Sequence, residues 1–149
     1  MKTAIVIVLI AHLSFISGTE HQVQNHKLNS VNIEFVGFDT ETFVDVSCEG
    51  FHSSFDNVKN KQFFSGEDLL QFKLMTKDFE PRTRLQSFDV RGEIIFRYGK
   101  IADKYCFDVW GNFYKDGKFY YNKTLLIYIA DKMLTYRHPK YLDTLRRDE

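Results

Sequence analysis

The fold is decided by residues 89–98, which read DVRGEIIFRY. Every second side chain in this stretch is apolar or glycine, and most of the side chains between them are charged. Successive side chains of a strand point to opposite faces, so this alternation predicts a strand with one buried and one solvated face. Gly99 starts a turn, and a partner strand is expected over about residues 104–114. An antiparallel pair therefore lies at the centre of the expected fold.

The strongest turn signal lies downstream of this pair, at Asp116-Gly117. This dipeptide favours a tight type I′ hairpin because glycine adopts a positive φ without steric strain. A short strand is expected to follow the turn, and Asn122 is then placed to cap a helix. That helix is expected to end at His138-Pro139, because a residue before proline is pushed out of the helical region.

Two further patterns precede the central strand. Apolar and polar residues alternate over residues 31–36 and again over residues 44–48, with a polar turn between them, which predicts an antiparallel hairpin. The period then lengthens, because Cys48, Phe51 and Phe55 are spaced three and four residues apart. This spacing is typical of the buried stripe of a short helix that packs onto a sheet.

A second helix is expected to open at Ser65, with Asp68 in the position of a capping acid, and to end at Pro81. The expected order of elements is then β-β-α-α-β-β-β-α. This order predicts an α+β two-layer domain, in which an antiparallel sheet of about five strands carries helices on one face.

The N-terminus has the pattern of an export signal. Lys2 precedes an apolar run that continues to about Ile16, and the small residues Ser17-Gly18 close the segment. The run is shorter than the ~20 apolar residues of a permanent membrane span, which favours cleavage over retention as an anchor. We therefore expect residues 1–18 to be a signal peptide.

The rest of the chain has the size of one domain. Residues 19–30 are mostly polar and show no periodicity, so they are expected to form a flexible leader before a single α+β domain over residues 31–149. The signal places the protein in the periplasm or the extracellular space, with no stable insertion in the membrane after cleavage.

Cys48 and Cys106 are the two cysteines of the chain. An even number of cysteines in a small exported domain favours a disulfide, so we expect these two to be bonded. The alternative is a reactive thiol at Cys48 with His52 as its base. That spacing by itself supplies no third group to orient the base, as a thiol hydrolase requires.

The charge balance argues against nucleic acid as a partner. The chain has 20 Lys and Arg against 20 Asp and Glu, a formal net charge of zero, whereas a nucleic-acid surface needs a basic excess or stripe. The sequence also contains no HExxH motif, no paired CxxC and no glycine-rich phosphate loop. We therefore expect neither a metal site nor a cofactor.

The aromatic residues around the Asp116-Gly117 turn are the candidate binding surface. The chain has fifteen Phe, eight Tyr and one Trp, and several lie in this hairpin. Neighbouring strand residues face opposite ways, so one layer of helices cannot bury them all. Outward-facing aromatic side chains are enriched at protein interfaces. The residues expected to contact a partner are Phe113, Tyr114, Phe119 and Tyr120.

Two classes of function remain open at this point. The first is a small exported binding or neutralising protein, of inhibitor or immunity type, that acts through a preformed surface on another exported protein and performs no chemistry itself. The second is a small exported hydrolase whose site is assembled from dispersed residues such as Asp45, His52 and Asp108. No catalytic motif supports the second class, and the oligomeric state is not constrained.

Overall fold

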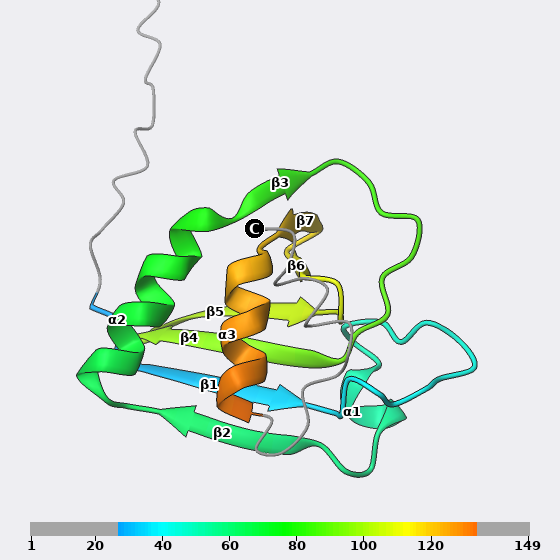
Figure 1. The fold of residues 1–149 in the computed structure, drawn as a ribbon, viewed down its shortest axis with the longest axis horizontal. Helices are drawn as coiled ribbons and strands as arrows, with labels where there is room; N and C mark the ends of the chain where they lie inside the picture. Colours follow the sequence, from blue (N-terminus) through cyan, green and yellow to red (C-terminus); the bar gives the residue numbers. More distant parts are fainter. Residues whose placement is uncertain (1–26, 134–149) are drawn as a thin grey trace, which may run out of the picture.

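The computed structural model describes residues 27–133 (Figure 1). The predicted signal peptide and the predicted helix end at His138-Pro139 lie outside these residues. Leu28 is already buried and the first strand begins at Ser30, so the packed region includes the last part of the expected leader. Along the described region, none of the helices has the length and apolar character that crossing a bilayer requires.

The described residues form one antiparallel sheet of seven strands, in the order β2-β1-β4-β5-β6-β7-β3, with three α-helices. The strands are β1 Ser30–Phe35, β2 Lys59–Phe63, β3 Glu80–Arg82, β4 Gly92–Tyr98, β5 Ile101–Phe107, β6 Asn112–Lys115 and β7 Lys118–Tyr121. The helices are α1 Phe51–Ser54, α2 Gly66–Met75 and α3 Lys123–Met133, and a 3₁₀ turn, η1 Thr76–Asp78, follows α2. Figure 1 shows α2 and α3 over the same face of the sheet. The predicted α+β class is confirmed, with more strands than expected.

Residues 92–98 of the stretch that decides the fold form β4, which lies between β1 and β5, and residues 89–91 precede the strand. Two of its apolar residues, Ile94 and Phe96, point to the face that carries α2 and α3 and are fully buried there. Phe72 of α2 packs edge-on against Phe63 of β2 and Phe96, and against Tyr128 of α3. One aromatic ring therefore joins both helices to the sheet, and burying it stabilises the fold by roughly 2–3 kcal/mol.

Gly92, at the start of β4, is required by the close approach of two neighbouring segments. A Cβ atom there would lie 2.6 Å from the carbonyl oxygen of Glu34 on β1, and it would also overlap the ring of Phe107 on β5. Glycine in a strand interior often marks such an approach.

The local signals at the ends of helices and at the tight turn are confirmed. The Oγ atom of Ser65 accepts a hydrogen bond from the backbone N–H of Asp68 at 3.2 Å and caps α2. The Oδ1 atom of Asn122 accepts one from the backbone N–H of Leu125 at 2.8 Å and caps α3. Asp116 and Gly117 have φ angles of 49° and 80°, as a type I′ turn requires.

The pairing of the first hairpin was predicted wrongly. Residues 44–48 form no strand, and β1 pairs instead with β2 on one side and β4 on the other. Among residues 44–48 only Val46 is buried, whereas Val44 is 75% exposed, so the alternation in the sequence does not correspond to a buried strand face. The side chain of Asp89 binds the backbone N–H of Val46.

Two other boundaries also differ from the prediction. The expected strand over residues 104–114 is divided into β5 and β6 by a turn, in which the carboxylate of Asp108 accepts hydrogen bonds from the backbone N–H groups of Trp110 and Asn112. Helix α2 ends at Met75, well before Pro81. That proline lies in the edge strand β3, where a missing N–H is tolerated.

Candidate functional site

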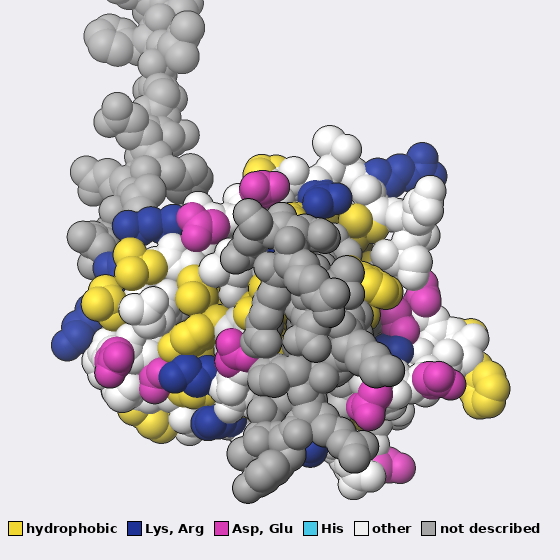
Figure 2. Space-filling view, viewed as in Figure 1, with side chains coloured by type: hydrophobic (Ala, Val, Ile, Leu, Met, Phe, Trp, Pro, Cys, Tyr) yellow, Lys and Arg dark blue, Asp and Glu magenta, His cyan; other side chains and the backbone are white. Residues whose placement is uncertain are grey.

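The most exposed apolar residues of the described region lie on the segment between β1 and α1. We call residues 37–47 the tip loop; they contain neither helix nor strand. The segment that follows β1 extends beyond the end of the sheet (Figure 1), and Figure 2 shows hydrophobic side chains at the end of this projection. At its tip, Phe43 has an exposed fraction of 110% and Val44 one of 75%.

The two ends of the tip loop are anchored in the body of the protein. The ring of Phe38 is buried and packs edge-on against Phe35 and Phe107, with ring centroids 6.0 and 6.3 Å apart. At the other end, the carbonyl oxygen of Val46 accepts a hydrogen bond of 3.0 Å from the backbone N–H of Val90. The apolar tip is therefore held between two fixed points.

A buried ion pair fixes the middle of the tip loop. The side chain of Arg91 is 7% exposed, and its guanidinium binds both carboxylate oxygens of Asp89. It also donates to the carbonyl oxygen of Thr40 and to the hydroxyl of Thr42, each at 3.1 Å. The Oδ1 atom of Asp89 accepts the backbone N–H of Val46 at 2.8 Å. Because the same two side chains bind the loop at three residues, the loop is preformed.

The electrostatics of this ion pair predict that the stability of the fold depends on pH in the acid range. Burial opposes the ionisation of Asp89, but the hydrogen bonds from Arg91 and Val46 outweigh it, so the pKa of Asp89 lies below its ordinary value of 3.8. A carboxylate with a lowered pKa stabilises the fold above its unfolded pKa, about 3.9, and this contribution is lost as the pH falls through the folded pKa.

We therefore expect Asp89→Asn to lower the thermal unfolding midpoint at neutral pH, and the gap between variant and wild type to narrow once the pH falls below about 4. Thermal unfolding followed by circular dichroism across that range measures the gap. A gap that stays constant into acid would show that the charge of Asp89 does not stabilise the loop.

Trp110 extends the apolar surface next to the tip loop. It is 59% exposed and lies in the turn between β5 and β6. With Thr40, Asp89 and Arg91 it lines a small pocket of about 150 Å³. The candidate binding surface therefore consists of Phe43 and Val44 on the tip loop and of Trp110, which shares its pocket with Thr40 of that loop and with the ion pair.

The aromatic residues predicted to bind a partner lie around the β6–β7 hairpin, and one of them is in the core. Phe113 is fully buried on the helix face, where it packs against Phe107 and Phe79, so its side chain is not available to a partner. Tyr120 is half-buried on the same face, against Phe79 and Tyr105.

The other two rings of the hairpin point to the opposite face of the sheet. Tyr114 and Phe119 are half-buried, and the ring of Phe88 packs against both, with centroid separations of 6.2 and 5.3 Å. The loop before β4 thus covers a face that α2 and α3 do not reach, beside the apolar cluster that contains Phe51 of α1. A contribution of Tyr114, Phe119 or Tyr120 to binding remains a prediction, with only part of each ring exposed.

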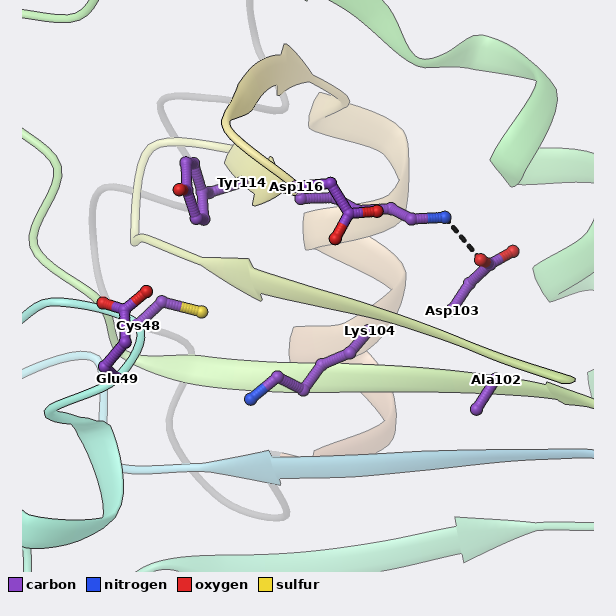
Figure 3. A pocket seen from close by; sticks show the side chains of 8 residues that line it. Cys48, Glu49, Ala102, Asp103, Lys104, Tyr114 and Asp116 are labelled. Atoms are coloured by element: carbon purple, nitrogen blue, oxygen red, sulfur yellow. Dashed lines mark hydrogen bonds and ion pairs between the residues drawn. The ribbon is translucent and has the colours of Figure 1, made fainter.

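Tyr114 also lines a pocket of about 340 Å³, beside Cys48 and Glu49 (Figure 3). Its walls are mostly charged, and the ammonium of Lys115 forms an ion pair with Asp103 across it. The lining places no nucleophile next to a base within this pocket. The residues that line this pocket are Cys48, Glu49, Ala102, Asp103, Lys104, Tyr114, Lys115 and Asp116.

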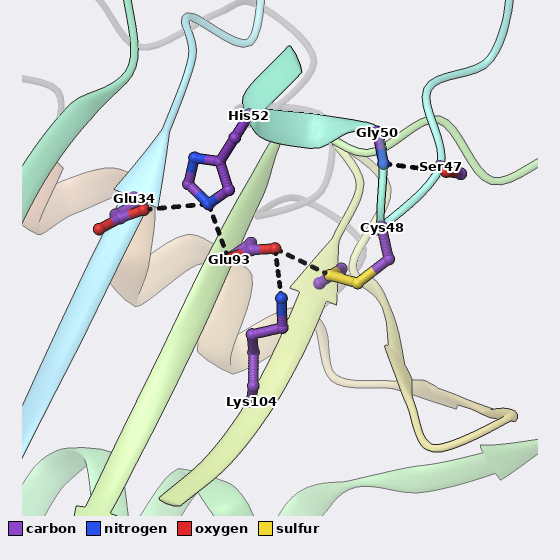
Figure 4. The surroundings of a disulfide bond; sticks show 8 residues. Glu34, Ser47, Cys48, Gly50, His52, Glu93 and Lys104 are labelled. Atoms are coloured by element: carbon purple, nitrogen blue, oxygen red, sulfur yellow. Dashed lines mark hydrogen bonds and ion pairs between the residues drawn. A yellow bond between two sulfur atoms is a disulfide. The ribbon is translucent and has the colours of Figure 1, made fainter. Parts of the chain in front are cut away.

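The predicted disulfide is confirmed. Cys48 and Cys106 are bonded across 58 residues of chain, with their Cα atoms 5.7 Å apart (Figure 4). The bond ties the turn before α1 to β5, and Cys106 is fully buried. The alternative of a thiol nucleophile at Cys48 is therefore wrong for this state of the protein, in which no free cysteine remains.

His52 has partners that the sequence did not indicate. Its Nε2 atom lies 3.4 Å from Glu34 and 3.2 Å from Glu93 (Figure 4). Those two glutamates are directly opposite each other on β1 and β4. We call these three residues the Glu-His-Glu cluster.

The residues of the hydrolase alternative do not share partners. Asp45 accepts a hydrogen bond from Ser87, whereas His52 binds the two glutamates of the cluster. Asp108 closes its own turn, and burial raises its pKa even though hydrogen bonds from Asn112 and neighbouring backbone oppose that rise. The described structure therefore gives no support to a site built from Asp45, His52 and Asp108.

No protein-family model, curated protein or solved structure matches this chain.

Proposed function

We propose that this protein is a small exported binding or neutralising protein, and that it engages another exported protein through the tip loop. The observation that carries the proposal is the full exposure of Phe43 on a loop that Arg91 and Asp89 hold in place. A single exposed apolar side chain is ordinary. A fully exposed phenylalanine next to an exposed valine, on a loop whose backbone is fixed, is typical of a contact surface.

The physical advantage of such a loop is that little order has to be gained on binding. Fixing a mobile loop and its side chains opposes association, so a preformed loop binds more tightly than a flexible one. Aromatic side chains that enter a pocket of the partner commonly dominate the binding energy. Phe43 fits the part of such an anchor, with the exposed Val44 next to it in the chain.

Two features support the exported setting of the proposal. The disulfide between Cys48 and Cys106 is of the kind that persists in oxidising compartments. The N-terminal sequence has the pattern of a signal peptide, as described above. Together they favour the periplasm or the extracellular space, and a partner from the same compartment.

The test is affinity capture from the exported fraction of the host, with the disulfide intact. We expect the wild-type chain to capture one protein in a stoichiometric amount. Phe43→Ser is expected to weaken that capture at least 30-fold, which corresponds to about 2 kcal/mol for a central aromatic anchor. Because Phe43 is fully exposed, the variant is expected to have the same thermal unfolding midpoint as the wild type.

Two further variants complete the experiment. Leu70→Ser changes an exposed apolar residue of α2, outside the tip loop, and is expected to bind like wild type. Phe119→Ser measures the contribution of the hairpin, with some loss of stability because Phe88 loses a contact. Undiminished capture by Phe43→Ser would exclude the tip loop as the binding surface.

A further inference from the structure

We infer that the Glu-His-Glu cluster, Glu34, His52 and Glu93, is a binding site for a divalent transition-metal ion, with zinc as the expected ion. The site lies on the face of the sheet opposite α2 and α3, beside the disulfide (Figure 4). The inference is independent of the tip loop, since it rests on different residues and different chemistry.

The first argument is the convergence of three ligand atoms. The Nε2 atom of His52 and one carboxylate oxygen from each of Glu34 and Glu93 lie within 4.8 Å of one another. In both glutamates the converging oxygen is Oε2. The cluster thus presents one imidazole nitrogen and two carboxylate oxygens toward a common point, a ligand set found in zinc sites.

The second argument is that separate donors already occupy the outer oxygens. The amides of Asn32 and Asn60 donate to Oε1 of Glu34 at 3.1 and 2.6 Å. The ammonium of Lys104 lies 2.8 Å from Oε1 of Glu93. Outer donors of this kind orient ligating carboxylates in metal sites. Both Oε2 atoms are left facing His52.

The third argument is a count of charges and donors. Glu34 and Glu93 are paired directly across the sheet, where like charges destabilise the fold. The Nε2 atom of His52 carries at most one hydrogen, so it cannot fully satisfy two carboxylate oxygens. A divalent cation bound to all three atoms would compensate the second charge and use the lone pair of a neutral imidazole.

The distances suit such an ion. Zinc bonds to nitrogen and carboxylate oxygen are about 2.0–2.2 Å long, so neighbouring ligand atoms of a tetrahedral site lie about 3.3–3.5 Å apart. The two separations from His52 Nε2 are 3.4 and 3.2 Å. Glu93 is almost fully buried, while the side chain of His52 is 56% exposed. The fourth coordination position of a bound zinc ion would therefore be open to solvent.

A residue that contacts the cluster also carries a buried polar atom without a partner among the described residues. Asn32, whose amide contacts Glu34, is only 6% exposed, and its Oδ1 atom has no hydrogen-bond partner within residues 27–133. Buried side-chain acceptors are usually paired, so an unpaired one calls for an explanation, and an ion or water bound at the cluster is one that fits. The imidazole ligand favours zinc over calcium or magnesium.

The test is zinc binding to the full chain after removal of metal with a chelator, followed by isothermal titration calorimetry. We expect the wild type to bind one zinc ion more than His52→Ala or Glu34→Gln, or to bind that ion at least tenfold more tightly. Cobalt is expected to give a visible absorption band of a four- or five-coordinate site in the wild type, and the same two variants are expected to weaken it. Glu93→Gln is avoided because Glu93 is buried.

Two more variants sharpen the result. Asn60→Ala removes an outer donor of Glu34 and is expected to weaken zinc binding about tenfold. Glu41→Gln removes an exposed charge of the tip loop and is expected to bind zinc like the wild type. Equal zinc binding by the wild type, His52→Ala and Glu34→Gln would overturn the inference, and so would a wild type that binds no zinc.

Discussion

Removing the disulfide, by replacing Cys48 and Cys106 together with alanine, is expected to lower the free energy of unfolding by about 4 kcal/mol. The bond closes a loop across 58 residues, and the loss of chain entropy in the unfolded state grows with the logarithm of that length. A domain of this size is stable by about 5–15 kcal/mol, so the loss is a large fraction of the whole.

The effect has a local part as well as a global one. The disulfide holds the turn before α1 against β5, and α1 carries His52 and the buried ring of Phe51. Without the bond, these groups depend on the small apolar cluster around Val36, Val90 and Phe51. The double variant is therefore expected to lose zinc affinity as well as stability.

Urea unfolding followed by circular dichroism measures the global effect, and the wild-type protein under reducing conditions is the matched control. The two are expected to share one midpoint. A double variant that unfolds within about 1 kcal/mol of the oxidised wild type would contradict the chain-entropy argument for this bond.

Signals that act between near neighbours in the chain were sufficient to predict part of the structure. The cap at Ser65, the cap at Asn122 and the turn at Asp116-Gly117 are each decided by a few adjacent residues. The central strand was also predictable, because the alternation of apolar and polar residues in it indicates which side chains are buried. These features do not depend on which strand lies beside which.

Strand pairing could not be predicted in the same way. Alternation over residues 31–36 shows one buried face, but it does not identify the partner strands. The true outer partner of β1 is β2, whose residues KNKQF show no alternation and are largely exposed. The other edge strand, β3, has only three residues and includes Pro81. Short, polar edge strands limit unwanted pairing between molecules, and they leave little pattern in the sequence.

The candidate sites could not be predicted either, because they depend on strand pairing and on contacts between distant parts of the chain. Glu34 and Glu93 are far apart in the chain, and only the register between β1 and β4 places them side by side. The exposure of Phe43 is equally invisible in a sequence with fifteen phenylalanines, because it follows from how Asp89 and Arg91 hold the loop. The expected absence of a metal site rested on motifs of contiguous residues, which the Glu-His-Glu cluster does not form.

Arg91→Met is expected to lower the free energy of unfolding by about 3 kcal/mol, at the lower end of the range for breaking a buried ion pair. The lower end applies because Asp89, left without its cation, still has 27% of its side chain exposed to solvent. The variant also leaves Thr40 and Thr42 without the donors that fix the tip loop. We therefore expect weaker capture of the partner, even though Phe43 itself is unchanged.

Two further variants distinguish the effect of losing the ion pair from a general destabilisation of β4 and the segment before it. Arg97→Met changes an exposed arginine of β4 and is expected to shift stability by less than about 0.5 kcal/mol. Adding Asp89→Asn to Arg91→Met removes the unpaired charge, so the double variant is expected to recover part of the lost stability. It is not expected to recover binding, because the arginine that holds the loop is still missing. If the double variant recovers both stability and binding, the tip loop does not need the hydrogen bonds from Arg91. If it recovers stability alone, Arg91 positions the tip of the loop for binding.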